Sequence, residues 1–160
     1  MKYSAIALSM VSLLALSACD SGPKSSAPAS TEQGAPITLE SAVNHKDRTP
    51  AYVERDQFRH PKETLEFFEL EPSITVVEIW PGGGYYSEIL APYLAEEGRF
   101  YAAHFPEDTQ SDYYQRSLNK FKERLTSEAV FGNVELTQFA PLTPLETDIA
   151  PPNSADRILT

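Results

Sequence analysis

The spacing of apolar residues along the second half of the chain changes repeatedly between the period of a strand and the period of a helix. Runs of β-branched and aromatic residues predict strands, and apolar residues three and four positions apart predict helices between them. Strands that alternate with helices indicate an α/β fold with a parallel sheet and right-handed crossovers. The four predicted strands cover residues 75–80, 99–105, 134–139 and 155–160.

Helices are predicted between and before these strands. Pro61 suits the first turn of a helix, and Glu71-Pro72 ends that helix before the first strand. The polar residues 47–57 predict either another helix or an ordered arm. The remaining predicted helices cover residues 37–44, 86–96 and 108–127. The last two have apolar faces made of Ile89, Leu90, Tyr93 and Leu94, and of Tyr114, Leu118, Phe121 and Leu125.

The N-terminus has a different pattern, which is typical of export. Lys2 precedes an apolar run over residues 5–16 that is too short to span a membrane and fits the core of a signal peptide. Small residues then lead to Cys19, the only cysteine of the chain. Leu16 to Cys19 resembles a bacterial lipobox, which implies that the signal peptide, residues 1–18, is removed and that Cys19 is lipid-modified. The alternative is an ordinary secretory signal followed by a chance cysteine.

A lipid on Cys19 would anchor the protein to a membrane of the bacterial cell envelope, facing the periplasm. Asp20 resembles a signal that retains lipoproteins in the inner membrane. Residues 19–36 are rich in Ser, Pro, Ala and Gly and bury too little apolar surface to fold, so we interpret them as the lipid anchor and a flexible linker. The folded domain is then expected over residues 37–160.

Composition argues against several classes of partner and site. The chain has 23 acidic and 13 basic residues, whereas binding to nucleic acid requires clustered Lys and Arg, so we expect no nucleic-acid partner. The three histidines are far apart and form no Cys/His cluster, so no metal site is predicted.

Most of the chemical information lies between the first predicted strand and the next helix, where open α/β sheets bind ligands. Three glycines in a row, Gly82 to Gly84, allow the backbone to approach a ligand closely. The spacing is not that of a dinucleotide-binding fingerprint, because Ser87 occupies the third glycine position. No Gly-Lys-Ser/Thr follows either, so the segment is not a phosphate-binding P-loop.

Glu78 together with Gly82, Gly83 and Gly84 resembles motif I of the class I S-adenosylmethionine-dependent methyltransferases. The longer run at 76–94, with residues 59–68 ahead of it, is similar to a group of uncharacterised bacterial predicted methyltransferases, and this likeness covers roughly residues 47–160. The resemblance implies a Rossmann-like methyltransferase fold. In that fold the glycines pack against the methionine part of the cofactor, and Glu78 orients the turn and the cofactor's ammonium. The alternatives are a tight turn without a ligand and an acid paired with a local basic group.

The end of the second strand departs from the family's pattern. Members usually carry an acid there that binds the ribose hydroxyls through both oxygens, whereas the matching stretch in this chain, residues 101–105, contains no acid and offers His104. An imidazole can hydrogen-bond to hydroxyls but lacks the charge and the two oxygens of a carboxylate. His104 is therefore either a cofactor contact or a structural or solvent-facing residue.

Neighbouring residues carry simpler expectations. We expect Ser87 to cap the helix that follows the glycines. Trp80 is expected to serve packing rather than ligand binding, and one of Tyr85 and Tyr86 should belong to the core. Phe139-Ala140 follows the third strand where the family often contacts adenine, but no side-chain hydrogen bond is evident there.

The resemblance implies an enzyme that transfers a methyl group from S-adenosylmethionine, a small-molecule donor, to an acceptor that the sequence does not identify. The sequence stops within the fourth predicted strand, so we expect a domain truncated there, with no nameable catalytic base and little or no activity of its own. Because S-adenosylmethionine is made in the cytoplasm and a lipobox directs export, one alternative is a non-catalytic, membrane-tethered module that binds a small molecule on the same fold. Another is a degraded remnant that does not fold.

Overall fold

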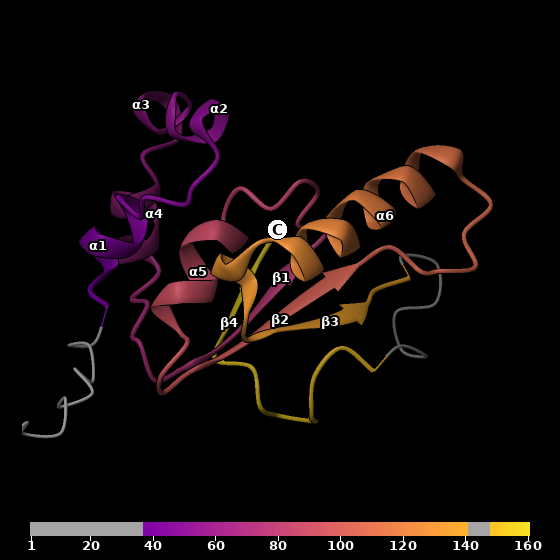
Figure 1. The fold of residues 1–160 in the computed structure, drawn as a ribbon. Helices are drawn as coiled ribbons and strands as arrows, with labels where there is room; N and C mark the ends of the chain where they lie inside the picture. Colours follow the sequence, from indigo (N-terminus) through magenta and orange to yellow (C-terminus); the bar gives the residue numbers. More distant parts are fainter. Residues whose placement is uncertain (1–36, 141–147) are drawn as a thin grey trace, which may run out of the picture. The chain divides into compact units, whose positions relative to one another are not determined.

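The computed structural model describes residues 37–140 and 148–160, and its centre is a four-stranded sheet. All strands are parallel, in the order β3-β2-β1-β4 (Figure 1). The strands are β1 (Thr75–Ile79), β2 (Arg99–His104), β3 (Val134–Gln138) and β4 (Arg157–Leu159). The predicted α/β fold with a parallel sheet is confirmed, and each strand lies within the range expected from its β-branched and aromatic residues.

The helices agree with the sequence pattern in place but are shorter than predicted. Where the polar residues 47–57 predicted a helix or an ordered arm, the chain has two short helices, Pro50–Val53 and Asp56–Arg59. The helix that starts at Pro61 ends at Phe67, before Glu71-Pro72, and Glu69 has a positive φ of 52°. The helices are α1 (Leu39–Val43), α2 (Pro50–Val53), α3 (Asp56–Arg59), α4 (Pro61–Phe67), α5 (Ser87–Tyr93), α6 (Asp112–Ser127) and the 3-10 helix η1 (Ala129–Phe131).

The core on one face of the sheet includes residues of α5, α6 and η1, and α1 and α4 add to this core from beside α5 (Figure 1). The predicted apolar face of α5 is confirmed, because all four of its members are buried. On α6, Leu118 and Phe121 are buried and Leu125 packs against them, whereas Tyr114 is 36% exposed and lies outside this core. The buried residues of this face include Ala42, Leu65, Val76, Ile89, Leu90, Phe100, Ala102, Phe121, Phe131 and Leu159.

The opposite face of the sheet has a smaller core of Val77, Tyr101 and Ala103. Phe139 and the segment Ile149-Ala150 pack against these residues. Successive residues of a strand point to opposite faces, so Val76 and Glu78 share the helix side while Val77 lies on the other side. This alternation directs the carboxylate of Glu78 toward α5.

The strand order determines where a ligand could lie. From the carboxyl end of β1 the chain passes to β2 and β3 on one side, and it later returns to β4 on the other side of β1. The glycine turn follows β1 directly, at this change of direction. The helices of the described residues include none that is long and apolar enough to cross a membrane. The predicted signal peptide (1–18), Cys19 and the linker (19–36) lie outside the described residues.

Candidate functional site

The turn between β1 and α5 contains three residues with positive φ. Gly82 and Gly84 have φ of 60° and 92°, which glycine adopts without strain. Trp80 has φ of 52°, which costs a residue with a side chain about 1–3 kcal/mol. Its backbone N–H donates to Ala103 O at 2.8 Å and its indole N–H donates to Phe139 O at 3.3 Å. Trp80 is therefore fixed across the carboxyl ends of β1, β2 and β3.

Glu78 lies one residue before the end of β1, with a side chain that is only 5% exposed. Its Oε2 accepts a hydrogen bond from Ser87 Oγ at 2.6 Å. Burial raises the pKa of Glu78 to about 7, and the bond from Ser87 and the positive charge of Arg59 oppose this rise. Protonated and ionised forms are thus both populated near neutral pH, and a bound cation would favour the ionised form.

Two expectations about this pair of residues need correction. Ser87 does not cap α5, because its hydroxyl donates to Glu78 and no side chain caps that helix. Among residues 37–140 and 148–160, Glu78 forms no ion pair with a local basic group, which was the alternative. Its hydrogen-bond partner there is the hydroxyl of Ser87. The hydroxyl of Ser87 bonds to Glu78 because a buried carboxylate without a donor would cost more free energy than an uncapped end of α5.

His104 is the last residue of β2 and is completely buried. Its Nδ1 accepts the N–H of Phe105 at 2.8 Å, so the ring proton is assigned to Nε2, which lies 3.3 Å from Gly82 O and donates to it. Burial lowers the pKa of His104, and the contact with Gly82 opposes the shift. His104 thus holds the glycine turn and does not face solvent. Its predicted contact with a cofactor stays a prediction, and it would require one of these bonds to be replaced.

Behind the turn, a buried ionic network joins α5 to α6. Glu88 is completely buried and accepts hydrogen bonds from Thr49 N at 2.9 Å and from Arg124 Nη2 at 2.5 Å. Arg124 also donates to Gly83 O and, through two nitrogens at 2.8 and 2.7 Å, to Glu128. One guanidinium therefore connects the glycine turn to both helices, and removal of a partner from such a buried pair costs about 3–5 kcal/mol.

The arm, residues 47–60, lies against the same turn. Arg48 forms a two-pronged ion pair with Asp56, at 2.6 and 3.0 Å, and Asp56 also accepts the hydroxyl of Tyr85 at 2.7 Å. Tyr52 approaches the turn so closely that a Cβ on Gly83 would lie 2.1 Å from its hydroxyl oxygen. Position 83 therefore requires a glycine because the arm lies so close to it, whereas positions 82 and 84 require glycines because their φ angles are positive.

An aromatic surface extends along the carboxyl ends of the strands. The indole of Trp80 stacks on Phe105 at 5.6 Å between ring centroids and lies 5.7 Å from Phe139. Phe105 in turn stacks on Tyr114 at 4.0 Å. Trp80 packs on these two phenylalanines, although 38% of it stays exposed, and its expected lack of a role in ligand binding stays a prediction. Tyr85, at 5% exposure, is the expected core tyrosine.

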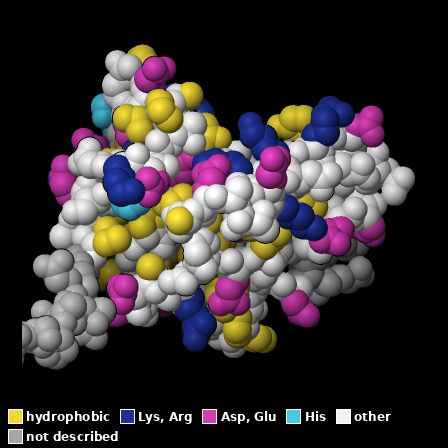
Figure 2. All heavy atoms as spheres, viewed as in Figure 1, with side chains coloured by type: hydrophobic (Ala, Val, Ile, Leu, Met, Phe, Trp, Pro, Cys, Tyr) yellow, Lys and Arg dark blue, Asp and Glu magenta, His cyan; other side chains and the backbone are white. Residues whose placement is uncertain are grey.

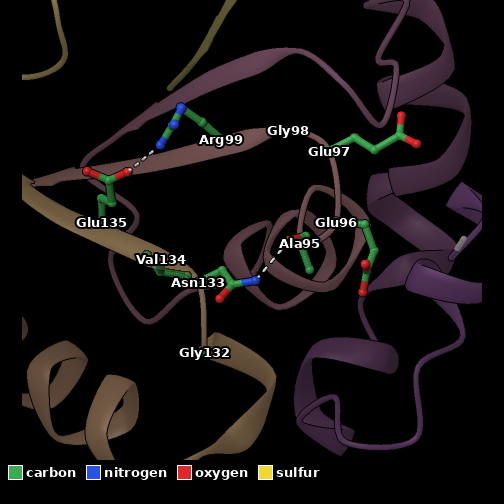
Figure 3. A pocket seen from close by; sticks show the side chains of 9 residues that line it. All are labelled: Ala95, Glu96, Glu97, Gly98, Arg99, Gly132, Asn133, Val134 and Glu135. Carbon is green, nitrogen blue, oxygen red and sulfur yellow. Dashed lines mark hydrogen bonds and ion pairs between the residues drawn. The ribbon is translucent and has the colours of Figure 1, made fainter. Parts of the chain in front are cut away.

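Two hollows in the surface differ in their distance from the glycine turn. One of about 510 Å³ lies at the amino ends of β2 and β3, where Arg99 and Glu135 form an ion pair at 3.5 Å (Figure 3). Parallel sheets bind ligands at the opposite ends of their strands, so this hollow is not the candidate site. Another of about 450 Å³ lies between the arm and α6 and is lined by Tyr52 and Arg124, which both contact Gly83.

Comparisons with protein-family models, with curated proteins and with solved structures found no match. Within the described part of the chain, no group of three or more His, Cys, Asp or Glu side chains could hold a metal ion. The face seen in Figure 2 has acidic and basic side chains interspersed and shows no extended basic region.

The structure brings the predicted residues Glu78, Gly82 to Gly84 and His104 together at the turn, but the charged residues behind the turn were absent from the sequence prediction. Glu88, Arg124 and Arg48 were missed because a charged residue within a helix or polar segment usually faces solvent. One signal was present: Glu88 directly precedes the apolar pair Ile89-Leu90, so a seven-residue helix with few polar positions has an acid next to its buried face.

Proposed function

We propose that this domain binds S-adenosylmethionine at the glycine turn and that its fold serves methyl transfer. The observation that carries the proposal is the position of the turn at the carboxyl end of β1, between β2 and β4. Open α/β sheets bind ligands in the crevice beyond the strands where the order changes direction. The order 3-2-1-4 is also that of the first four strands of the doubly wound dinucleotide-binding folds, which supports a Rossmann-like methyltransferase fold.

Glu78 supports the choice of a cationic ligand. Its buried carboxylate lies beside the turn, and Ser87 is its one hydrogen-bond donor within residues 37–140 and 148–160. S-adenosylmethionine carries an ammonium and a sulfonium, and either charge would stabilise the ionised form of a carboxyl whose pKa burial has raised to about 7.

The reaction asks little acid–base chemistry of the protein. A lone pair of the acceptor attacks the methyl carbon, the carbon–sulfur bond breaks, and its electrons remain on sulfur as a neutral thioether. Holding donor and acceptor in line supplies most of the acceleration. No residue of this chain is assigned as a base, and the acceptor stays open. In this proposal Cys19 anchors the domain to a membrane, facing the periplasm.

His104 favours a second candidate, a non-catalytic, membrane-tethered module that binds a small molecule. The last residue of β2 is a histidine and not an acid, and both of its ring nitrogens already hydrogen-bond to the protein. It therefore has no free group for ribose hydroxyls. The two candidates differ in turnover, while both include a ligand at the glycine turn.

The single tryptophan provides the test. Because Trp80 is the only tryptophan in the chain and lies at the carboxyl ends of the strands, its fluorescence reports on this site alone. We expect S-adenosylmethionine and S-adenosylhomocysteine to change its emission saturably. Methyl transfer to a panel of acceptors, followed with a labelled donor, would then separate the enzyme from the binding module. A folded chain whose emission neither compound changes would contradict the proposal.

A further inference from the structure

Two arginines at the ends of helix α3 lie over the segment that follows the glycine turn: Arg55 directly precedes the helix, and Arg59 is its last residue. The guanidinium carbons of Arg55 and Arg59 lie 5.4 and 4.6 Å from the ring centroid of Tyr85. Arg59 is also 5.5 Å from the ring of Tyr86. Tyr85 and Tyr86 directly follow Gly84, so both positive charges lie beside the chain that joins the turn to α5.

These charges have no anionic partner among the residues that the structure describes. Arg48, a third guanidinium over the ring of Tyr85, is bound by Asp56, whereas the exposed Arg55 and Arg59 form no ion pair or side-chain hydrogen bond within residues 37–140 and 148–160. Stacking on a tyrosine face positions a guanidinium but leaves its N–H donors free. The pair is therefore available to an anionic group of a ligand.

Glu78 supplies the opposite charge next to them. Its carboxylate is almost completely buried, and Ser87 Oγ is its single hydrogen-bond donor within the described residues, so one oxygen has no partner. Ser87 follows Tyr86, and the charge of Arg59 is close enough to lower the pKa of Glu78 against the effect of burial. An anion and a cation, each with unused hydrogen-bonding capacity, thus flank one stretch of backbone.

We propose that Arg59, assisted by Arg55, binds the carboxylate of a ligand's α-amino-acid group, beside the ammonium that the resemblance already implies for Glu78. The inference rests on the proposed function, because that group would be the amino-acid end of S-adenosylmethionine. A guanidinium matches a carboxylate through two parallel hydrogen bonds. The buried carboxylate selects an ammonium, because a neutral group there would leave its charge uncompensated. Nucleosides without this group would bind weakly.

The test compares S-adenosylmethionine with its decarboxylated form, which retains the ammonium and the sulfonium. Dissociation constants of both are measured for the full-length chain, for Arg59→Ala and for Arg59→Lys, with Arg99→Ala as the control. Arg99 is an exposed arginine at the amino end of β2, away from the turn. We expect Arg59→Ala to weaken S-adenosylmethionine about tenfold, as for loss of a hydrogen bond between charged groups, and to leave the decarboxylated compound unchanged. Arg59→Lys should give a smaller loss for S-adenosylmethionine alone.

The outcomes separate this inference from the function on which it rests. Equal weakening of both compounds by Arg59→Ala would mean that the arginine only supports the arm, and unchanged binding of both would mean that the carboxylate lies elsewhere. Either result overturns the inference and retains the proposed function. A folded wild-type chain that binds neither compound would overturn both.

Discussion

Replacement of Glu78 by glutamine should change how the stability of the protein depends on pH. Glutamine has nearly the shape of the carboxyl group and can accept the hydrogen bond from Ser87, but it does not ionise. In the wild-type chain, burial raises the pKa of Glu78 from 4.5 to about 7. The folded protein therefore holds a proton that the unfolded chain releases over this interval, and wild-type stability falls as pH rises through it.

The size of the effect follows from the shift. A rise of about 2.5 pKa units, at 1.36 kcal/mol per unit, corresponds to about 3 kcal/mol. The free energy of unfolding of Glu78→Gln, minus that of the wild type, should therefore increase by about 3 kcal/mol between pH 4.5 and pH 8. Above pH 8 the difference should become constant, because Glu78 is then ionised in both states.

Urea denaturation at half-unit steps of pH, followed by circular dichroism, measures this difference. The comparison between the variant and the wild type is needed because His104 also titrates in this range, and its effect on stability has the opposite dependence on pH. Its pKa is lowered by burial, so the unfolded chain takes up a proton below pH 6.5 and stability falls as pH falls. Glu97→Gln, an exposed acid, serves as the control and should give a curve parallel to the wild type. A Glu78→Gln curve that is also parallel would refute the account of Glu78 as a buried acid with a raised pKa.

Three further predictions concern the contacts that hold the turn, and chemical denaturation checks each. Gly83→Ala should cost about 1–3 kcal/mol because its methyl would meet the hydroxyl of Tyr52, and Tyr52→Phe should restore part of that loss; an additive double variant would contradict this. Arg124→Met should cost about 3–5 kcal/mol because Glu88 stays buried without its partner, and Glu88→Gln in the same chain should recover part; a neutral Arg124→Met would argue against a buried network. His104→Asp, which supplies the acid of the family's pattern, should cost about 3 kcal/mol at pH 8 and less at pH 5, because an ionised carboxylate would replace a donor to the turn; unchanged stability at both pH values would refute the role of His104.

The parallel α/β fold could be predicted because it depends on local patterns. Four of the five residues from Thr75 to Ile79 are β-branched, and α5 has its apolar residues at helical spacing, so both elements follow from local patterns. The helix ends were predicted less accurately, because they depend on single contacts. Helix α6 begins at Asp112, where the side chain of Ser111 accepts the N–H of Tyr114 at 3.5 Å.

The organisation of the site could not be predicted in the same way, because it depends on residues far apart in the sequence. Glu88 and Arg124 are 36 positions apart and lie on different helices. Their pairing appears only when β2 brings the two helices to one face of the sheet. The exchange of an acid for His104 was visible in the sequence, but the bond from its imidazole to Gly82 O depends on the path of the turn.

A calorimetric titration of S-adenosylhomocysteine into three forms of the chain tests the ligand site most directly. The forms are the wild type, Gly82→Ala and Gly132→Ala. A Cβ on Gly82 would meet only Trp80 O, at 4.0 Å, so the new methyl group would occupy the open side of the turn, where a ligand would bind. Because φ of Gly82 is 60°, alanine also strains the backbone by about 1–2 kcal/mol, so the binding is compared only after the variant is shown to unfold cooperatively like the wild type. Gly132 lies outside the turn and has room for a methyl group, with its nearest atom at 3.6 Å. Saturable binding by the wild type and Gly132→Ala, weakened at least tenfold in Gly82→Ala, is the result that we predict. Equal binding by all three forms, or none by a folded wild-type chain, would contradict a cofactor site at the glycine turn.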